Sequence, residues 1–133
     1  MKNFKHISTL FISILLIFSG CTVETKDTTP PANPSGVSLT PSANNLIISW
    51  VTPSDYDFDG VEVTHETDTS SSKVKLSSER NSKQAILIEQ VNKEILNKFT
   101  ISSVDIYGNK SSGIIKTYGK DIIPPQEVSS VTI

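Results

Sequence analysis

The chain has few of the residues that usually build chemical sites. Its 133 residues include one cysteine, one tryptophan, one methionine and two histidines. The single cysteine, Cys21, excludes an intramolecular disulfide, so the folded part must depend on its hydrophobic core. Neither a G-x-S-x-G nucleophile elbow nor a phosphate-binding G-x-x-x-x-G-K loop occurs. The sequence therefore predicts a protein that is not an enzyme and that carries no cofactor.

The chain also lacks an excess of positive charge. Twelve Lys and Arg residues stand against fourteen Asp and Glu residues, for a formal net charge of −2. Lys2 and Lys5 lie in a segment that we expect to be removed, which leaves ten basic residues and a net charge of −4. Nucleic acids attract clustered Lys and Arg. The charge pattern therefore predicts no nucleic-acid partner.

The first twenty residues have the pattern of a secretory signal. Lys2 and Lys5 precede an apolar run over residues 7–19, which is shorter than the ~20 residues that span a bilayer as a helix. A short buried helix is the alternative, but neither a helix cap nor an amphipathic period accompanies the run. We predict that residues 1–20 are a signal peptide.

The apolar run ends in Phe18-Ser19-Gly20-Cys21. This motif resembles the lipobox of bacterial lipoproteins, although Phe18 replaces the usual leucine. The resemblance implies a mature chain that begins at Cys21, modified by palmitate and other acyl chains, which together hold a protein firmly to a membrane. Thr22 follows in place of aspartate, which in Gram-negative lipoproteins implies the outer membrane or cell surface. The alternative is ordinary cleavage that leaves a free thiol.

The segment after the cysteine has the composition of a linker. Residues 21–34 contain Thr, Pro, Asp and Lys with almost nothing apolar. Such a composition is typical of an extended, flexible connection. We therefore expect residues 21–34 to be a lipid-anchored tether.

Short alternating apolar and polar runs fill residues 35–120. A period of two, interrupted by turn residues, is typical of short strands, and seven such runs favour an all-β sandwich of two sheets. The candidate strands are residues 36–40, 45–51, 60–66, 72–76, 83–88, 98–105 and 113–118. The residues expected to face the core are Ile48, Trp50, Val61, Val63, Phe99 and Ile101.

Four stretches resemble parts of a fibronectin type III domain. They correspond to its start (residues 27–31), its second strand (residues 46–50), its third strand (residues 59–63) and its sixth strand with the following turn (residues 99–111). The resemblance implies a seven-stranded, immunoglobulin-like β-sandwich with Trp50 in its core. Asn97 stands where this family has its corner tyrosine. The hydroxyl-to-backbone hydrogen bond of that corner is therefore absent or made another way, and the expected stability is lower.

A second copy of the domain start follows the first. Residues 121–125, Asp-Ile-Ile-Pro-Pro, match the Asp-Thr-Thr-Pro-Pro of residues 27–31 at an offset of 94 residues, and residues 131–133 match 37–39 at the same offset. Repeats at domain length indicate an array. We favour residues 121–133 as the start of a second, truncated repeat, because an unpaired strand edge is a liability. A harmless tail is the alternative.

One acidic pattern could hold a metal ion. Asp55, Asp57 and Asp59, with Gly60 and Glu66, satisfy the D-x-D-x-D-G-x₅-E spacing of a calcium loop. No helical pattern flanks it, and in an extended third strand Glu66 would lie roughly 20 Å from Gly60, at ~3.3 Å per residue. We therefore expect an acidic loop and no metal site, with weak binding of Ca²⁺ by the three aspartates as the alternative.

His65 and three aromatic residues complete the candidates. His65 has no second histidine beyond the predicted signal to complete a transition-metal site, and we expect it at an exposed strand position. Tyr56, Phe58 and Tyr107 lie in or beside predicted turns and could form an exposed patch that binds sugar or protein. Scattered loop aromatics without a function are the alternative.

The sequence as a whole predicts a lipid-anchored protein of the cell envelope. We expect attachment to the membrane through Cys21 and a β-sandwich that serves as a spacer or protein-interaction module, with protein or polysaccharide at the cell surface as the partner. The alternative is the N-terminal stalk of a longer surface enzyme, one acting on polysaccharide, or of an adhesin. A calcium-stabilised adhesin module is a third hypothesis.

Overall fold

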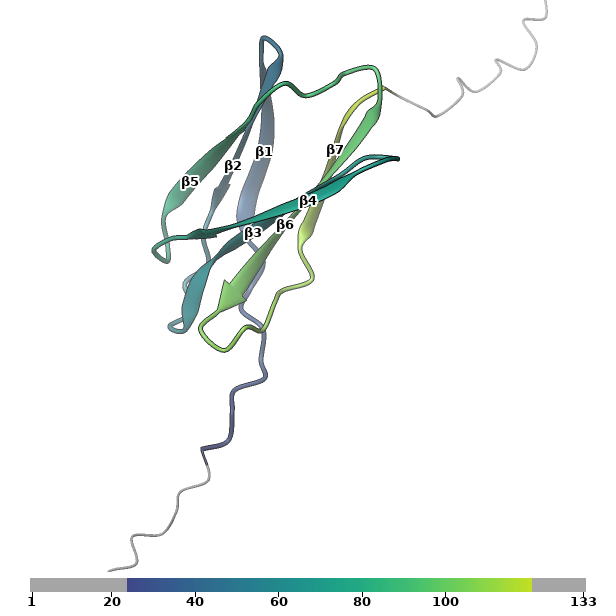
Figure 1. Cartoon of the computed structure of the whole chain (residues 1–133). Coiled ribbons are helices and arrows are strands. Elements are labelled where there is room, and N and C mark those ends of the chain that lie inside the picture. Colours follow the sequence, from purple (N-terminus) through teal and green to yellow (C-terminus); the bar gives the residue numbers. More distant parts are fainter. Residues whose placement is uncertain (1–23, 121–133) are drawn as a thin grey trace, which may run out of the picture.

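Seven strands make up the fold of the described part of the chain (Figure 1). The computed structural model describes residues 24–120, so Cys21, the predicted signal peptide and the predicted second repeat lie outside the described residues. Residues 24–120 contain no helix, and therefore none with the length and apolar character to cross a bilayer. The strands are β1 (Ser35–Ser42), β2 (Asn45–Val51), β3 (Phe58–Glu66), β4 (Ser71–Ser77), β5 (Lys83–Ile88), β6 (Leu96–Asp105) and β7 (Ile114–Gly119).

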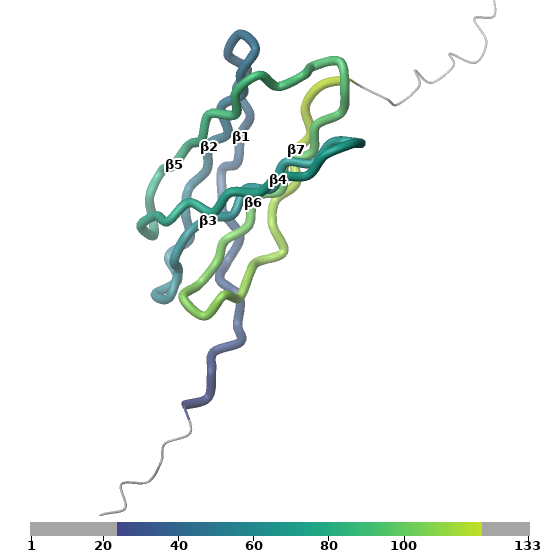
Figure 2. Tube along the Cα trace, in the orientation of Figure 1, coloured from purple at the N-terminus to yellow at the C-terminus, as the bar shows by residue number. Residues whose placement is uncertain are grey.

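The strands form two sheets that pack as two layers (Figure 2). One sheet has the order β1-β2-β5 and the other the order β4-β3-β6-β7, and all neighbours pair antiparallel. The predicted all-β sandwich is confirmed. The chain enters at one end of the sandwich, and β7 ends at the opposite end (Figure 1).

The core lies between the two sheets, and strand alternation accounts for its composition. In β2, Leu46, Ile48 and Trp50 are buried while the residues between them are partly exposed, because successive side chains of a strand point to opposite faces. Each fully buried side chain of this size contributes about 1.5–3 kcal/mol. The buried cluster contains all six residues expected there and consists of Leu46, Ile48, Trp50, Val61, Val63, Val91, Phe99 and Ile101.

The strand boundaries lie within two residues of those expected, and β2 and β5 match them fully. β3 begins at Phe58, two residues early, because an irregularity between Phe58 and Gly60 lets its pairing with β6 continue. Gly60 also lies so close to β4 that a Cβ atom would collide with the carbonyl oxygen of Leu76. A glycine is therefore required at this point of the sheet.

The predicted tether of residues 21–34 is too long. Pro31 and Pro34 are buried, and the amide of Asn109 donates to the carbonyl oxygen of Asp27 at 2.9 Å. The polar composition indicated a free linker, but the segment from Asp27 onward is hydrogen-bonded to the sandwich. The folded unit therefore begins at Asp27, where the family resemblance also begins.

Candidate functional site

The end of the sandwich at which the chain enters is the candidate site (Figure 1). Three segments that lie far apart in the sequence meet there: residues 27–34, the β2–β3 loop (residues 52–57) and the β6–β7 loop (residues 106–113). We call these three segments the N-terminal end. Loops carried by a rigid sheet are common positions for binding residues.

Backbone amides connect the three segments. The N–H of Ile106 donates to the carbonyl oxygen of Asp57 at 2.9 Å, which joins the two loops. The N–H of Ala32 donates to Asp55 Oδ2 at 3.2 Å, which joins the N-terminal segment to the β2–β3 loop. These bonds give the N-terminal end a defined geometry.

Asp105, the last residue of β6, organises the β6–β7 loop. Its side chain is 1% exposed, and its Oδ1 accepts hydrogen bonds from the N–H groups of Tyr107 at 2.9 Å and Asn109 at 2.8 Å. Its Oδ2 accepts a hydrogen bond from Asn109 Nδ2 at 2.7 Å. The same Nδ2 donates to the carbonyl oxygen of Asp27. One buried carboxylate thus shapes the loop and, through Asn109, holds the N-terminal segment.

Two neighbouring carboxyl groups at this end have opposite pKa shifts. Burial alone would raise the pKa of Asp105, but the hydrogen bonds from Asn109, Tyr107 and Gly108 stabilise the charged form and hold the pKa below its ordinary value. Burial raises the pKa of Asp57, and the negative charges of Asp105 and Asp27 raise it further. The fold therefore favours the charge on Asp105 and disfavours it on Asp57.

Apolar side chains project from this end. Tyr56 is 79% exposed, Ile106 is 61% exposed and Tyr107 is 42% exposed. Phe58, the third aromatic residue of the predicted patch, packs instead against the core. The exposed patch therefore consists of two tyrosines and an isoleucine, and Ile106 is a member that the sequence analysis missed.

The acidic residues of the calcium pattern are separated by β3. Asp59 pairs with Lys75, and Glu66 pairs with Lys98 at 3.0 Å. Glu66 is the last residue of β3, whereas the two aspartates of the β2–β3 loop precede its first residue. Within residues 24–120 no group of three or more His, Cys, Asp or Glu side chains lies close enough to hold a metal ion.

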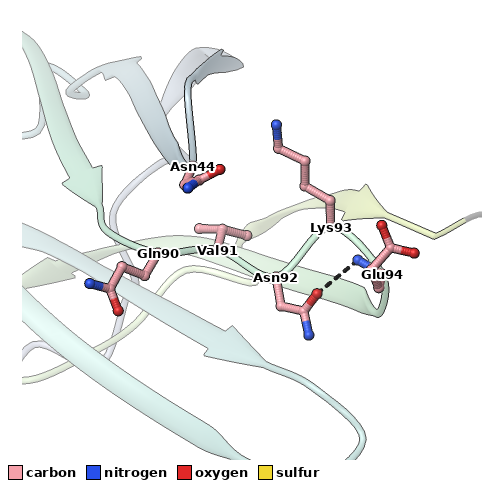
Figure 3. Close-up of a pocket in the computed structure, with 6 residues that line it drawn as sticks. All are labelled: Asn44, Gln90, Val91, Asn92, Lys93 and Glu94. Atoms are coloured by element: carbon pink, nitrogen blue, oxygen red, sulfur yellow. Dashed lines mark hydrogen bonds between the residues drawn. The ribbon is translucent and has the colours of Figure 1, made fainter.

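A pocket at the opposite end of the sandwich is lined mainly by polar side chains (Figure 3). We call the β1–β2 turn (residues 43–44) and the β5–β6 loop (residues 89–95) the far end. A shallow hollow lies there, and its polar side chains are exposed. Asn92 Oδ1 accepts a hydrogen bond from the N–H of Glu94 at 2.9 Å. The hollow is lined by Asn44, Gln90, Val91, Asn92, Lys93 and Glu94.

Asn97 supplies the connection that the missing corner tyrosine would make. Its side chain is 1% exposed, and Nδ2 lies within hydrogen-bond distance of the carbonyl oxygens of Asn92 (2.8 Å), Ile95 (3.0 Å) and Tyr118 (3.2 Å). The amide therefore ties the β5–β6 loop to β6 and β7. Of the two outcomes expected at this position, the structure shows the second: the corner is made another way.

The expectation that His65 is exposed is wrong. The side chain is half-buried, with its ring stacked on Phe99 at a centroid distance of 4.5 Å and an interplanar angle of 17°. His65 Nε2 lies 2.8 Å from Asn97 Oδ1. Because three carbonyl oxygens orient the Asn97 amide, Oδ1 is the acceptor and Nε2 carries the hydrogen. The imidazole is thus part of the packing between β3 and β6.

Other residues that hold the N-terminal end together were also missed. Asn109 and Asn33 belong to no sequence motif, because each is hydrogen-bonded to a backbone group that is distant in the sequence. Asn33 Oδ1, for example, accepts a hydrogen bond from the N–H of Gly113 at 2.8 Å. The stretch Asp105-Ile106-Tyr107-Gly108-Asn109 gives one signal that was available. An aspartate before such a turn often bonds to backbone N–H groups two or more residues on.

The strand order and the packing of the sheets define the class: the structure has the fold of a fibronectin type III domain. The fibronectin type III domain of human contactin 1 superposes with a TM-score of 0.52 at 14% identity, over 77% of this chain and 91% of that domain. The spore cortex lytic enzyme SleM of Clostridium perfringens matches with a TM-score of 0.54 at 18% identity, over 69% of this chain. No protein-family model and no curated protein matches the sequence.

This chain spans only part of some of the chains that it matches. The aligned region covers 29% of SleM. A chicken CNTN1 chain with domains FN1–FN3 also matches, with a TM-score of 0.52 at 17% identity, and the aligned region covers 33% of it. At these identities the similarity establishes the fold, and function must be argued from the site.

Proposed function

We propose that this chain is a lipid-anchored protein of the cell envelope whose sandwich serves as a spacer or protein-interaction module without catalysis. The observation that carries the proposal is the position of the two ends: the chain enters at one end of the sandwich and β7 ends at the other (Figure 1). A domain connected in this way adds its own length between an anchor and whatever follows it. The lipobox-like motif that ends at Cys21 supplies the anchor.

The position of His65 supports a structural role for the sandwich. Residues 24–120 contain one histidine, His65, which is hydrogen-bonded to Asn97 and stacked on Phe99. Both contacts are with residues of β6, so the ring takes part in the packing of β3 against β6.

Lipid labelling tests the anchor. We expect the full chain, expressed in a bacterial host with radiolabelled palmitate, to take up label and to sediment with membranes. The matched Cys21→Ser variant removes the acylated thiol and should remain unlabelled. An unlabelled natural chain in the soluble fraction would overturn the proposal.

A second candidate is the N-terminal stalk of a longer surface enzyme or adhesin. The repeat of residues 27–31 at 121–125 favours it, and SleM, a spore cortex lytic enzyme, contains a domain of this fold within a longer chain. The nucleotide sequence after the Ile133 codon, read in all three frames, distinguishes the candidates. Further strand patterns with a core tryptophan would favour the stalk, and unrelated sequence after a stop codon would favour the single module.

A further inference from the structure

The exposed apolar residues of the N-terminal end lie beside the point where the chain enters the fold. Tyr56 and Tyr107 come from different loops, and the bond between the N–H of Ile106 and the carbonyl oxygen of Asp57 holds these loops together. The patch is therefore a fixed surface on the body of the domain. Because residues 27–34 are bonded to the same loops, the chain leaves the fold at the same end as the patch.

The chain between the lipid site and the fold is short. Five residues, 22–26, separate Cys21 from Asp27. Fully extended at ~3.3–3.6 Å per residue, this connection reaches about 20 Å. Asp27 is held by Asn109, so an acylated Cys21 keeps the N-terminal end within this distance of the lipid.

We propose that the N-terminal end rests on the lipid surface, with Tyr56, Ile106 and Tyr107 at the boundary between headgroups and acyl chains. This inference rests on the lipid anchoring proposed above. Tyrosine rings favour this boundary because one end of the ring is apolar and the other carries a hydroxyl group. Ile106 adds an apolar side chain that is otherwise exposed to water.

The charges at this end define which lipid surface fits. Asp57 and Asp105 are buried, and Asp55 Oδ2 accepts the N–H of Ala32. The chain as a whole is acidic, which disfavours a strongly anionic membrane. The surface that fits is therefore a zwitterionic one, such as phosphatidylethanolamine.

A lipid surface is favoured over a soluble partner because the lipid anchor keeps the patch close to the membrane. Tethering turns the contact into an intramolecular event at high effective concentration, so weak contacts suffice. The far end presents polar side chains instead, among them Gln90, Asn92, Lys93 and Glu94. The domain would therefore stand with its far end, where β7 ends, away from the membrane.

Fluorescence quenching by lipid tests the orientation. Trp50 is the single tryptophan and is 2% exposed, so it contributes a constant background. A Tyr56→Trp variant places a reporter in the patch, and the matched Lys93→Trp variant places one at the far end. Each full chain is purified in its lipidated form and reconstituted into phosphatidylethanolamine-rich vesicles that contain acyl-chain-brominated lipid. We expect quenching of the patch reporter to exceed that of the far-end reporter at least threefold.

Each outcome decides between the two proposals. If palmitate-labelled protein shows equal quenching of the patch reporter and the far-end reporter, the anchor stands, but the proposed contact between the N-terminal end and the lipid is overturned. If the chain takes up no palmitate, the anchor and this contact are overturned together. If quenching of the patch reporter falls as the number of proteins per vesicle rises, a second copy covers the patch, which also overturns the contact with lipid.

Discussion

The two ends of the sandwich are each closed by one buried polar side chain, and the two side chains are of opposite hydrogen-bonding type. At the N-terminal end the carboxylate of Asp105 accepts hydrogen bonds from the N–H groups of Tyr107 and Asn109. At the far end the amide of Asn97 donates to backbone carbonyl oxygens. Both side chains are 1% exposed.

The difference shows how a loop selects its central residue. A loop that turns backbone N–H groups inward needs an acceptor, and one that turns carbonyl groups inward needs a donor, because a buried backbone group without a partner costs about 1–3 kcal/mol. An aspartate meets the first need and carries a titratable charge. An asparagine meets the second without one. Acidification should therefore weaken the N-terminal end through Asp105, whereas Asn97 itself does not titrate.

Exchanging the hydrogen-bond donor for an acceptor at the far end should lower the free energy of unfolding the most. Asn97→Asp keeps the shape of the side chain but points a buried carboxylate at three carbonyl oxygens. We expect the free energy of unfolding to fall by more than about 3 kcal/mol at pH 7. Urea denaturation followed by Trp50 fluorescence measures it.

The control for this substitution is Asn92→Asp, at an exposed position of the same loop. It should cost less than about 0.5 kcal/mol. Equal losses in the two variants would mean that the far end does not depend on the Asn97 amide.

Exchanging the acceptor for a donor at the N-terminal end should give the next largest loss of stability. Asp105→Asn removes the negative charge and can turn an amide NH₂ toward the NH₂ of Asn109. We expect a loss of about 2 kcal/mol at pH 7, since hydrogen bonds to a charged acceptor are the stronger ones. Ser112→Ala, which removes one hydroxyl from the surface of the same loop, is the matched control and should change stability little.

The advantage of the natural chain over Asp105→Asn should depend on pH. The pKa of Asp105 is lowered in the fold, so its charge stabilises the fold above the unfolded value of about 3.9. This stabilisation is lost as the pH falls through the lower pKa of the folded state. Denaturation curves for both chains between pH 7 and pH 2 should therefore converge in acid, and a constant difference would refute the assignment.

Asp57→Asn should have a smaller effect of opposite sign. Burial, followed by the charges of Asp105 and Asp27, raises the pKa of Asp57. Ionised Asp57 therefore opposes folding at pH 7, and this opposition disappears below the unfolded value of about 3.9. The variant should melt at a higher temperature than the natural chain at pH 7 and at a similar one near pH 3, by calorimetry. A lower melting temperature at pH 7 would contradict the assignment.

Release of the N-terminal segment should have the smallest effect on global stability. Asn33→Ala removes the bonds of its side chain to Ser112 and Gly113. We expect a loss of about 0.5–1 kcal/mol but a clear rise in the rate of proteolytic cleavage within residues 24–34. Thr29→Ala, at an exposed position of the same segment, is the control. Cleavage at equal rates in both variants would show that Asn33 does not hold the segment.

Local patterns predicted most of the fold. The alternation of Leu46, Ile48 and Trp50 placed β2 at its observed boundaries, since the periodicity of a strand is a property of neighbouring residues. The same argument failed for Phe58, because its burial depends on how β3 begins and on a bulge that no local pattern marks. His65 was placed on an exposed face although the alternation of Val61 and Val63 puts it on the buried face, where its ring stacks on Phe99.

The candidate site was less predictable than the core. Tyr56 and Tyr107 were recognised as exposed aromatics, whereas the exposure of Ile106, which directly precedes Tyr107, was not predicted. The approach of Tyr56 to Ile106 and Tyr107 depends on two loops being brought together by the packing of β3 against β6. Loop residues are grouped by tertiary structure because the chain between them is folded away into strands.

The sequence by itself determined the class of the fold, the strands and the buried faces of β2, β3 and β6, because hydrophobic burial acts on a repeat of two residues that can be read locally. It also determined that stability cannot depend on an intramolecular disulfide, since Cys21 is alone. The tertiary structure decided that the fold begins at Asp27, that Asn97 replaces a tyrosine and that Asp105 and Asn109 close the N-terminal end. These features are hydrogen bonds between distant backbone and side-chain groups, whose partners exist only once the sheets have packed.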